Sequence, residues 1–364
     1  MKILNTYPVD DQFYMPGEFE AHSGCWLLWP ERGDIWPNNA LPAQNLLLKL
    51  ANTICQYENV TLGVSAKNYK DVKKRVCQNV RVVEISYNDI WIRDFGAIFL
   101  TNPSKSQLRG VSWNFNAWGG ENEGLYFPWD LDNQLSSKMC DLDNIDFYQS
   151  NLILEGGSIC VDGCGTLITT EECLLNENRN PNKTKDEIEK YLRRYFNVQT
   201  VIWLPNGMDE DETGGHVDNI CCFTAPNEVL LTWTDDKSDP QWEVSRNAYK
   251  ELIKHKDKSN NQLKINKIVH PPLISITEEE CNLYSEGYKT IKRRAGDKLP
   301  ASYINFYQND NAIFFPLFGV ETDELALNQI KLIVPQKEII TFQTRDFLLG
   351  GGNIHCITQQ IPKI

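Results

Sequence analysis

The stretch Gly350-Gly351-Gly352-Asn353-Ile354-His355-Cys356 places a cysteine directly behind a run of three glycines. Glycine adopts backbone conformations that are closed to other residues, and it lets a ligand approach the main chain closely. A thiol presented on such a turn, just after an apolar segment, is typical of a nucleophile that faces a pocket. A buried core cysteine is the alternative, because free cysteine is among the most buried residue types. The rest of the chain decides between the two.

The composition is that of a globular enzyme. The chain has 364 residues, of which 41% are hydrophobic and 23% are charged, enough for one large domain or two. No apolar run approaches the roughly 18 residues that a membrane span needs, and the first residues lack the apolar core of a signal peptide. We therefore expect a cytoplasmic protein that does not enter a membrane.

Charge and cysteine content narrow the class further. The formal net charge is −13, which disfavours nucleic acid as a partner and is compatible with a cationic substrate. The eleven cysteines are odd in number and no export signal accompanies them, so reduced thiols are expected rather than disulfides.

Helical and strand-like segments alternate along the chain. Helices are predicted after Pro42, after the capping box of Thr184 and Glu187, and around Trp242. Short strands are predicted at residues 60–64, 80–85, 229–233, 312–315 and 338–342. The alternation predicts a mixed α/β class.

Glycine pairs punctuate this pattern at 119–120, 156–157, 214–215 and 350–352. Such pairs can mark equivalent turns in repeated units. Their spacing is uneven, so four unrelated tight turns are an equally good interpretation.

Residues 88–96 combine two carboxylates, an arginine and a tryptophan beside a predicted strand. With strand alternation, Trp91 and Arg93 point to one side and Asp94 to the other. The cluster predicts a cleft that holds a cation, since a tryptophan face attracts positive charge. A surface turn with an ion pair is the alternative.

Two further segments supply candidate acid/base groups. Glu155 follows an apolar run and precedes a turn, so it faces either a pocket or solvent at a sheet edge. His216 and Asp218 have the spacing that puts both on one face of a strand, where a histidine paired with a carboxylate is a suitable general acid/base. A satisfied core histidine is the alternative. The acidic run 209–212 that precedes them is more often a solvated loop.

The aromatic segment 113–120 includes Trp118, which forms either a pocket wall or, more commonly, core. Neither a metal nor a nucleotide cofactor is predicted. The five histidines show no HExxH spacing, the cysteines no CxxC spacing, and no phosphate-binding glycine loop is present.

Taken together, these segments resemble the agmatine deiminase family of the guanidine-modifying enzymes, which are similar to peptidyl-arginine deiminases. The resemblance runs from about residue 15 to residue 362 and rests on the joint presence, in order, of several short stretches. These are residues 15–18, 29–32, 88–96, 115–120, 154–157, 176–181, 215–219, 299–305 and 350–360.

The resemblance implies a fold. Members of this family are α/β propellers (penteins), with five modules around a pseudo-fivefold axis and the active site in the central channel. It also implies that residues 1–364 form a single catalytic domain, and that the chain self-associates into a homo-oligomer.

The resemblance further implies residue roles. Cys356 corresponds to the nucleophile and His216 to the general acid/base. Asp94 and Asp218 correspond to the carboxylates that bind the guanidinium, and Glu155 to a further catalytic carboxylate. The remaining substrate-binding candidates are Trp91, Glu212 and Trp118.

The implied reaction is hydrolysis of agmatine to N-carbamoylputrescine and ammonia through a thiouronium intermediate on Cys356, without a cofactor. The run 209–212, and Glu212 in particular, is expected to hold the distal amine. Deimination of free arginine is an alternative, with Arg93 or Arg179 binding the α-carboxylate. Transfer of the amidino group to an amine, or catalytically silent binding of a guanidine or polyamine, are further alternatives.

Overall fold

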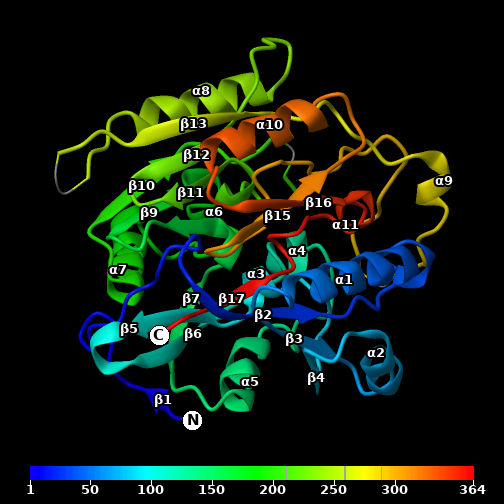
Figure 1. Cartoon of the computed structure of the whole chain (residues 1–364), viewed down its shortest axis with the longest axis horizontal. Coiled ribbons are helices and arrows are strands. Elements are labelled where there is room, and N and C mark those ends of the chain that lie inside the picture. The colour runs from blue at the N-terminus through cyan, green and yellow to red at the C-terminus, as the bar shows by residue number, and fades with distance from the viewer. Residues whose placement is uncertain (210, 258–259, 288) are drawn as a thin grey trace.

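Helices and strands alternate along the whole molecule, as the sequence predicts (Figure 1). The computed structural model describes residues 1–209, 211–257, 260–287 and 289–364. The α-helices are α1 (Leu41–Ile54), α2 (Tyr69–Arg75), α3 (Ile92–Phe95), α4 (Gly120–Glu123), α5 (Leu135–Leu142), α6 (Glu171–Leu174), α7 (Lys185–Phe196), α8 (Gln241–Leu252), α9 (Glu278–Cys281), α10 (Asp323–Ile333) and α11 (Arg345–Leu348). Short 3₁₀ turns lie at η1 (Asn38–Ala40), η2 (Pro103–Lys105), η3 (Gly156–Ser158) and η4 (Val217–Asn219).

The described strands form five separate sheets. They are β17-β2-β3-β4, β5-β6-β7-β1, β8-β9-β10, β11-β12-β13 and β14-β15-β16. Their bounds are β1 (Ile3–Leu4), β2 (His22–Leu28), β3 (Asn59–Val64), β4 (Val80–Glu84), β5 (Ile98–Asn102), β6 (Gln107–Asn114), β7 (Phe147–Ile153), β8 (Ile159–Val161), β9 (Thr166–Thr170), β10 (Thr200–Leu204), β11 (Cys221–Ala225), β12 (Glu228–Trp233), β13 (Lys264–Val269), β14 (Tyr307–Gln308), β15 (Ala312–Leu317), β16 (Glu338–Gln343) and β17 (Gln359–Pro362).

All five sheets share one pairing order. An antiparallel pair comes first, as in β14 with β15 or β17 with β2, and a parallel partner follows on the other side of the second strand. The same order holds for β5-β6-β7, β8-β9-β10 and β11-β12-β13. A helix lies between the two parallel strands along the chain in each case, since parallel strands need a crossover. This unit of an antiparallel pair, a helix and a parallel strand therefore repeats along the chain, although the glycine pairs are unevenly spaced.

These crossover helices form where local sequence chemistry favours them. In α1 the residues Leu47, Leu50 and Ile54 repeat at helical spacing and are fully buried. Helix α7 begins with the predicted capping box, in which Thr184 accepts from the Glu187 amide while the Glu187 side chain accepts from Thr184. All five strand predictions coincide with β3, β4, β12, β15 and β16 to within a residue or two.

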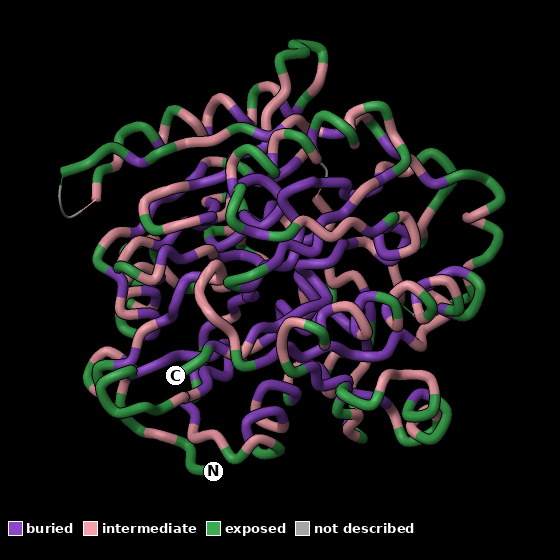
Figure 2. The backbone as a smooth tube through the Cα atoms, in the orientation of Figure 1, coloured by how far each residue is buried: buried purple, intermediate pink, exposed green. Residues whose placement is uncertain are grey.

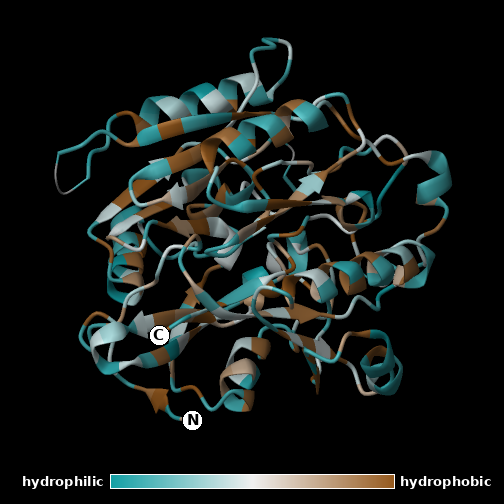
Figure 3. Cartoon of the chain, viewed as in Figure 1, coloured by the Kyte–Doolittle hydropathy of each residue, from teal (hydrophilic) through white to brown (hydrophobic). Residues whose placement is uncertain are grey.

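Apolar strands build the interior. Buried backbone gathers in the middle of the molecule, whereas the outer loops and the outward helix faces are exposed (Figure 2). Hydropathy follows the same division, with apolar residues concentrated in the strands and polar ones on the outer faces of helices such as α8 (Figure 3). Among the described residues, no helix is both long and apolar enough to cross a membrane.

One pairing joins distant parts of the chain. Strand β17 pairs antiparallel with β2, so that Gln359 lies opposite Trp26. Immediately before β17, the carbonyl of Cys356 accepts a hydrogen bond from the amide of Arg93 in α3. This pairing fixes the cysteine turn against the short helix that carries Asp94.

Candidate active site

Short helical turns carry the candidate residues. Trp91 caps α3 and Asp94 lies within it, Glu155 caps η3, and Asp218 lies in η4. The strand geometry predicted for residues 88–96 and 216–218 is therefore wrong, because both segments turn before or after a strand instead of continuing it.

This correction changes where the side chains point. Trp91 and Asp94 both line one pocket, whereas strand alternation placed them on opposite sides. Arg93 points away from that pocket and donates to Glu18 and Gln360. His216 and Asp218 still face a common space, because His216 caps η4 and Asp218 follows within the same turn.

The pocket is narrow and has apolar walls. It is lined by five of the predicted residues, namely Trp91, Asp94, Trp118, Glu212 and Cys356. The other lining residues are Ile35, Leu125, Tyr126, Thr213, Ile291, Arg293, Gly350 and Gly351.

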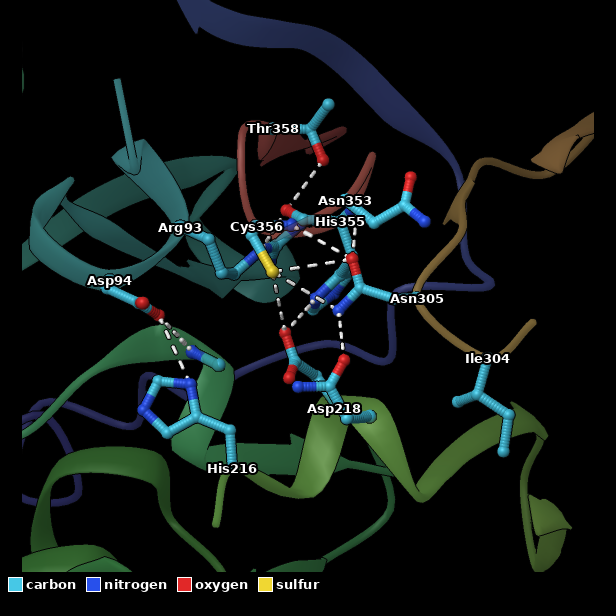
Figure 4. Close-up of polar contacts among 12 residues, drawn as sticks. Arg93, Asp94, His216, Asp218, Ile304, Asn305, Asn353, His355, Cys356 and Thr358 are labelled. Carbon is cyan, nitrogen blue, oxygen red and sulfur yellow. Dashed lines mark hydrogen bonds and ion pairs between the residues drawn. The ribbon is translucent and has the colours of Figure 1, made fainter. Parts of the chain in front are cut away.

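Cys356 lines this pocket and is a buried residue with 7% of its surface exposed. Asn305 holds it, with Nδ2 at 3.2 Å from Sγ and Oδ1 accepting from the His355 amide at 3.1 Å (Figure 4). Asp218 Oδ2 lies 3.8 Å from Sγ. Burial, followed by the charges of Asp218 and Asp94, raises the pKa of the thiol well above its ordinary value. The thiol is therefore protonated at neutral pH until a positive charge arrives.

His216 is enclosed by anions and is 1% exposed. Its Nδ1 lies 3.8 Å from Asp94 Oδ1 and its Nε2 lies 3.9 Å from Glu155 Oε2. Burial alone would lower its pKa, but Asp94, Cys173 and Asp218 outweigh burial and raise the pKa well above the usual value. The ring is thus an imidazolium at neutral pH, ready to give a proton.

The two aspartates have different partners. Asp94 accepts from the Gly157 amide and from the Trp118 indole, each at 2.9 Å. Burial raises the pKa of Asp94 to about 6, with His216 opposing the rise and Asp218 adding to it. Asp218 Oδ2 bonds His355, while its Oδ1 is buried without a partner among the described residues. A buried carboxylate oxygen in this state can accept a hydrogen bond from a ligand N–H.

The residues converge on one point beside Gly157. A β-carbon added to Gly157 would lie 2.7 Å from His216 Nδ1, 2.8 Å from Asp94 Oδ1 and 2.9 Å from Asp218 Oδ2. These distances are shorter than van der Waals contact, so glycine at this position is what allows the two carboxylates and the imidazole to pack so closely together. Two carboxylates and an imidazole gathered next to the Cys356 pocket suit the binding of a planar cation, because each carboxylate can accept charge-assisted hydrogen bonds.

Glu155 is paired rather than exposed to solvent. Both it and Arg179 have no exposed side-chain surface, and Arg179 Nε donates to Glu155 Oε1 at 2.6 Å. The other guanidinium nitrogens donate to the carbonyls of Trp118 and Thr213 and to the Asn178 side chain. Arg179 thus ties the Trp118 and Thr213 backbones, both of which line the pocket, to the carboxylate behind His216.

Aromatic rings form the pocket wall. Trp91 stacks on Trp36 with ring centroids 5.2 Å apart, and Trp118 meets Trp91 edge-on at 6.5 Å. Trp36 is held in turn by a hydrogen bond to Asp89 at 2.9 Å. Trp118 has φ = +64°, a strained value for a bulky residue that is often found at functional sites.

The described residues of the acidic run are not a solvated loop. Asp209 pairs with Lys298, and Asp211 accepts from the His216 amide, which fixes the histidine turn. Glu212 receives both terminal nitrogens of Arg293, at 2.7 and 2.9 Å. Glu210 lies outside the described residues.

Three potential metal-ligand atoms, from Glu155, Cys173 and His216, lie within 4.8 Å of one another. The guanidinium of Arg179 already neutralises Glu155, and its charge would repel a cation placed there. The charge balance therefore favours an ion pair over a metal centre at this group.

A model of Porphyromonas-type peptidyl-arginine deiminases matches residues 14–362. The chain belongs to this family. It is 50% identical over 360 residues to a Listeria monocytogenes protein named "Putative agmatine deiminase 2", and this match covers 99% of the chain and 97% of the relative. The solved structure of Enterococcus faecalis agmatine deiminase is similar with a TM-score of 0.96 at 41% identity, covering 100% of this chain and 99% of that one. A C. jejuni agmatine deiminase with substrate bound has a TM-score of 0.79 at 26% identity, covering 96% of each chain.

The sequence did not reveal every residue of this deiminase-family site. Asn305, Gly157 and His355 lie inside stretches that carry the resemblance, yet their contacts with Cys356, His216 and Asp218 depend on the fold. Arg293 comes from a loop with no distinguishing local pattern.

Proposed function

We propose that the chain hydrolyses agmatine to N-carbamoylputrescine and ammonia. The observation that carries this proposal is the convergence of Asp94, Asp218 and His216 around Gly157, next to the Cys356 thiol. The solved relatives named agmatine deiminase support it.

Binding orients a poor electrophile. The two aspartates accept charge-assisted hydrogen bonds from the planar guanidinium, and Trp91 and Trp118 wall the pocket around its chain. Fixing the guanidinium carbon near Sγ makes the attack effectively unimolecular.

The thiol ionises as the substrate arrives. In the free protein the nearby aspartates raise the pKa of Cys356, and the guanidinium cancels much of that negative potential. The thiolate is the nucleophile, so substrate binding and activation of the thiol are one event.

Two displacement steps complete the reaction. Sγ of the thiolate attacks the guanidinium carbon. His216 then gives its proton to the departing nitrogen, which leaves as ammonia, and a thiouronium remains on Cys356. His216, now neutral, takes a proton from water, which adds to the same carbon. The C–S bond then breaks, and the ureido product and the thiol are released. This sequence requires no cofactor.

The described arginines bear on the choice between agmatine and arginine. Arg93 and Arg179 are buried and bonded elsewhere, so neither is available for an α-carboxylate. Arg293 is the only arginine among the described lining residues, and Glu212 neutralises it. The α-carboxylate of arginine therefore meets no unpaired cation among the described lining residues. The ammonium of agmatine, in contrast, can bind Glu212 together with Arg293.

Steady-state kinetics with agmatine and free arginine side by side, following ammonia and the ureido product, test this function. We expect kcat/KM for agmatine to exceed that for arginine by about 10³-fold or more, because one uncompensated buried charge costs several kcal/mol. A reversed preference would indicate arginine deimination. Turnover of neither would favour amidino transfer or silent binding.

Glu212→Gln should reduce the preference for agmatine over arginine. Removing the carboxylate frees Arg293 and leaves the ammonium without its partner, so we expect kcat/KM for agmatine to fall about 10- to 100-fold while that for arginine rises. Glu177→Gln, a change outside the pocket lining, is the matched control. Equal losses on both substrates would contradict this role for Glu212.

The pH profile should rise with pH and change slope near pH 6. The free protein must lose the Cys356 proton while keeping that of His216, and both pKa values are raised, so log kcat/KM should rise by about one per pH unit across neutrality. Below about pH 6 Asp94 also becomes protonated and loses the guanidinium, so the slope should steepen to about two. A flat profile between pH 6 and 8 would mean that the thiol is already ionised.

We further propose that the five sheets are equivalent modules of one propeller-like domain spanning residues 1–364. The shared pairing order supports this arrangement, as does the contribution of α3, η3, η4 and the cysteine turn to one site. Self-association of the chain remains a prediction, to be tested by sedimentation.

A further inference from the structure

His355, the residue before the nucleophile, bonds carboxylates on both ring nitrogens. Its Nδ1 lies 2.8 Å from Asp218 Oδ2, and its Nε2 lies 2.9 Å from Glu18 Oε2 (Figure 4 shows the side facing Asp218). A neutral imidazole has one N–H donor and one acceptor nitrogen, whereas an ionised carboxylate only accepts. Two ionised partners therefore require a ring that carries both protons.

The surroundings stabilise that charge. Glu18 also receives Arg93 Nη1 at 2.9 Å, so Glu18 and Asp218 lie among two cations and the four charges cancel. The backbone is engaged as well, because Arg93 Nε donates to the His355 carbonyl at 3.3 Å. The thiols of Cys160 and Cys222 face the same small cavity, and burial raises the pKa of each, so they add no charge.

The protonation behaviour agrees with the geometry. Burial and Arg93 act to lower the pKa of His355, but Glu18 and the hydrogen bond to Asp218 outweigh them and raise it. Burial acts to raise the pKa of Glu18, while Arg93 and His355 outweigh burial and hold it well below its usual range.

We propose that His355 is a positioning residue: a permanently protonated imidazolium, held by Glu18, that fixes the Asp218 carboxylate for the guanidinium. This inference rests on the proposed function and extends it to two residues outside the pocket lining. His355 occupies Oδ2 of Asp218 and leaves Oδ1 as the acceptor open to a substrate N–H.

The two histidines of the site then have opposite roles. His216 has an Nε2 without a hydrogen-bond partner among the described residues, and it gives and takes a proton in each turnover. His355 has a partner on both nitrogens and keeps its protons throughout the cycle. A ring bonded on both sides cannot rotate toward the leaving group without breaking an ion pair.

The first test is the protonation state itself. Nitrogen-15 labelling of the five histidines, with His355→Gln to assign the signal, should show His355 doubly protonated from pH 6 to 9 in the substrate-free protein. Glu18→Gln keeps the side-chain shape and an acceptor oxygen but removes the charge, so in this variant the ring should lose a proton within that range.

Kinetics provide the second test. We expect Glu18→Gln to lower kcat/KM for agmatine by about 10- to 100-fold above the new His355 ionisation, mostly through KM, and to approach wild-type values at lower pH. His270→Gln, which changes a histidine outside the pocket and away from these carboxylates, should leave the profile unchanged. Thermal melting of each variant separates a folding defect from a positioning defect.

The outcomes are distinct. A wild-type His355 that titrates between pH 6 and 8, or a folded Glu18→Gln variant whose profile keeps the wild-type shape, would overturn the positioning role. A wild-type protein that releases no ammonia from agmatine would instead overturn the proposed function, and the nitrogen-15 measurement would still report the charge on His355.

Discussion

Replacing Cys356 with alanine should reduce ammonia release from agmatine by at least about 10⁴-fold, because loss of a nucleophile removes the covalent route entirely. The variant should still bind agmatine, since Asp94, Asp218 and the tryptophan wall are unchanged. Calorimetry would measure that binding, and a coupled ammonia assay the rate.

Cys140→Ala is the matched control, because Cys140 is a buried thiol of the hydrophobic core. It should lose some stability through the cavity created and retain turnover. Mass spectrometry of the wild-type protein quenched during turnover should show an adduct of agmatine less ammonia on Cys356. Full activity of Cys356→Ala would refute the nucleophile assignment.

Replacing Gly157 with alanine should also lower activity strongly, although it removes no functional group. The added methyl would lie within 3 Å of His216, Asp94 and Asp218, so it would push these groups out of the positions in which they meet the guanidinium. We expect kcat/KM for agmatine to fall by at least about 100-fold, as a displacement of about 1 Å at a reacting centre can cost this much. The loss should appear in KM as well as in kcat.

Gly296→Ala is the control for this substitution: a β-carbon there meets no atom within 4 Å, and the expected cost is backbone strain alone, from an alanine at φ = +91°. Iodoacetamide labelling of Cys356 would distinguish displaced carboxylates from a collapsed site. The thiol should remain modifiable in a folded Gly157→Ala variant that no longer binds agmatine. Wild-type KM in that variant would show that the guanidinium binds elsewhere.

Features that depend on neighbouring residues could be predicted from the sequence. The capping box at Thr184, the apolar face of α1 and the buried strands are encoded within a few residues, and the structure confirms them. The identity of the candidate site residues followed from a resemblance of motifs, and the structure brings Cys356, His216 and Asp94 together.

The two wrong strand predictions have a common cause. Residues 88–96 and 216–218 each contain spacings that suit a strand, but each is too short for periodicity to separate a strand from a single helical turn. Tertiary contacts decide the outcome, such as the Asp211 carboxylate that captures the His216 amide.

Partners distant in sequence could not be predicted at all. The bonds of Asn305 to Cys356, of Arg293 to Glu212 and of Glu18 to His355 each join separate parts of the chain. The recurrence of the five sheets was hidden for a related reason, because strand pairing repeats while the intervening lengths do not.

The pairing of β17 with β2 has a consequence for how the protein acquires its reactivity. Gln359 and Trp26 are separated by most of the sequence, so this contact carries a large loop-closure entropy and belongs to the slow, non-local part of folding. The cysteine turn leads directly into β17, and its backbone accepts a hydrogen bond from α3 that requires both parts of the chain to be in place. Partly folded chains would therefore hold all their thiols without an assembled site, and catalytic competence should emerge only with the last cooperative step of folding.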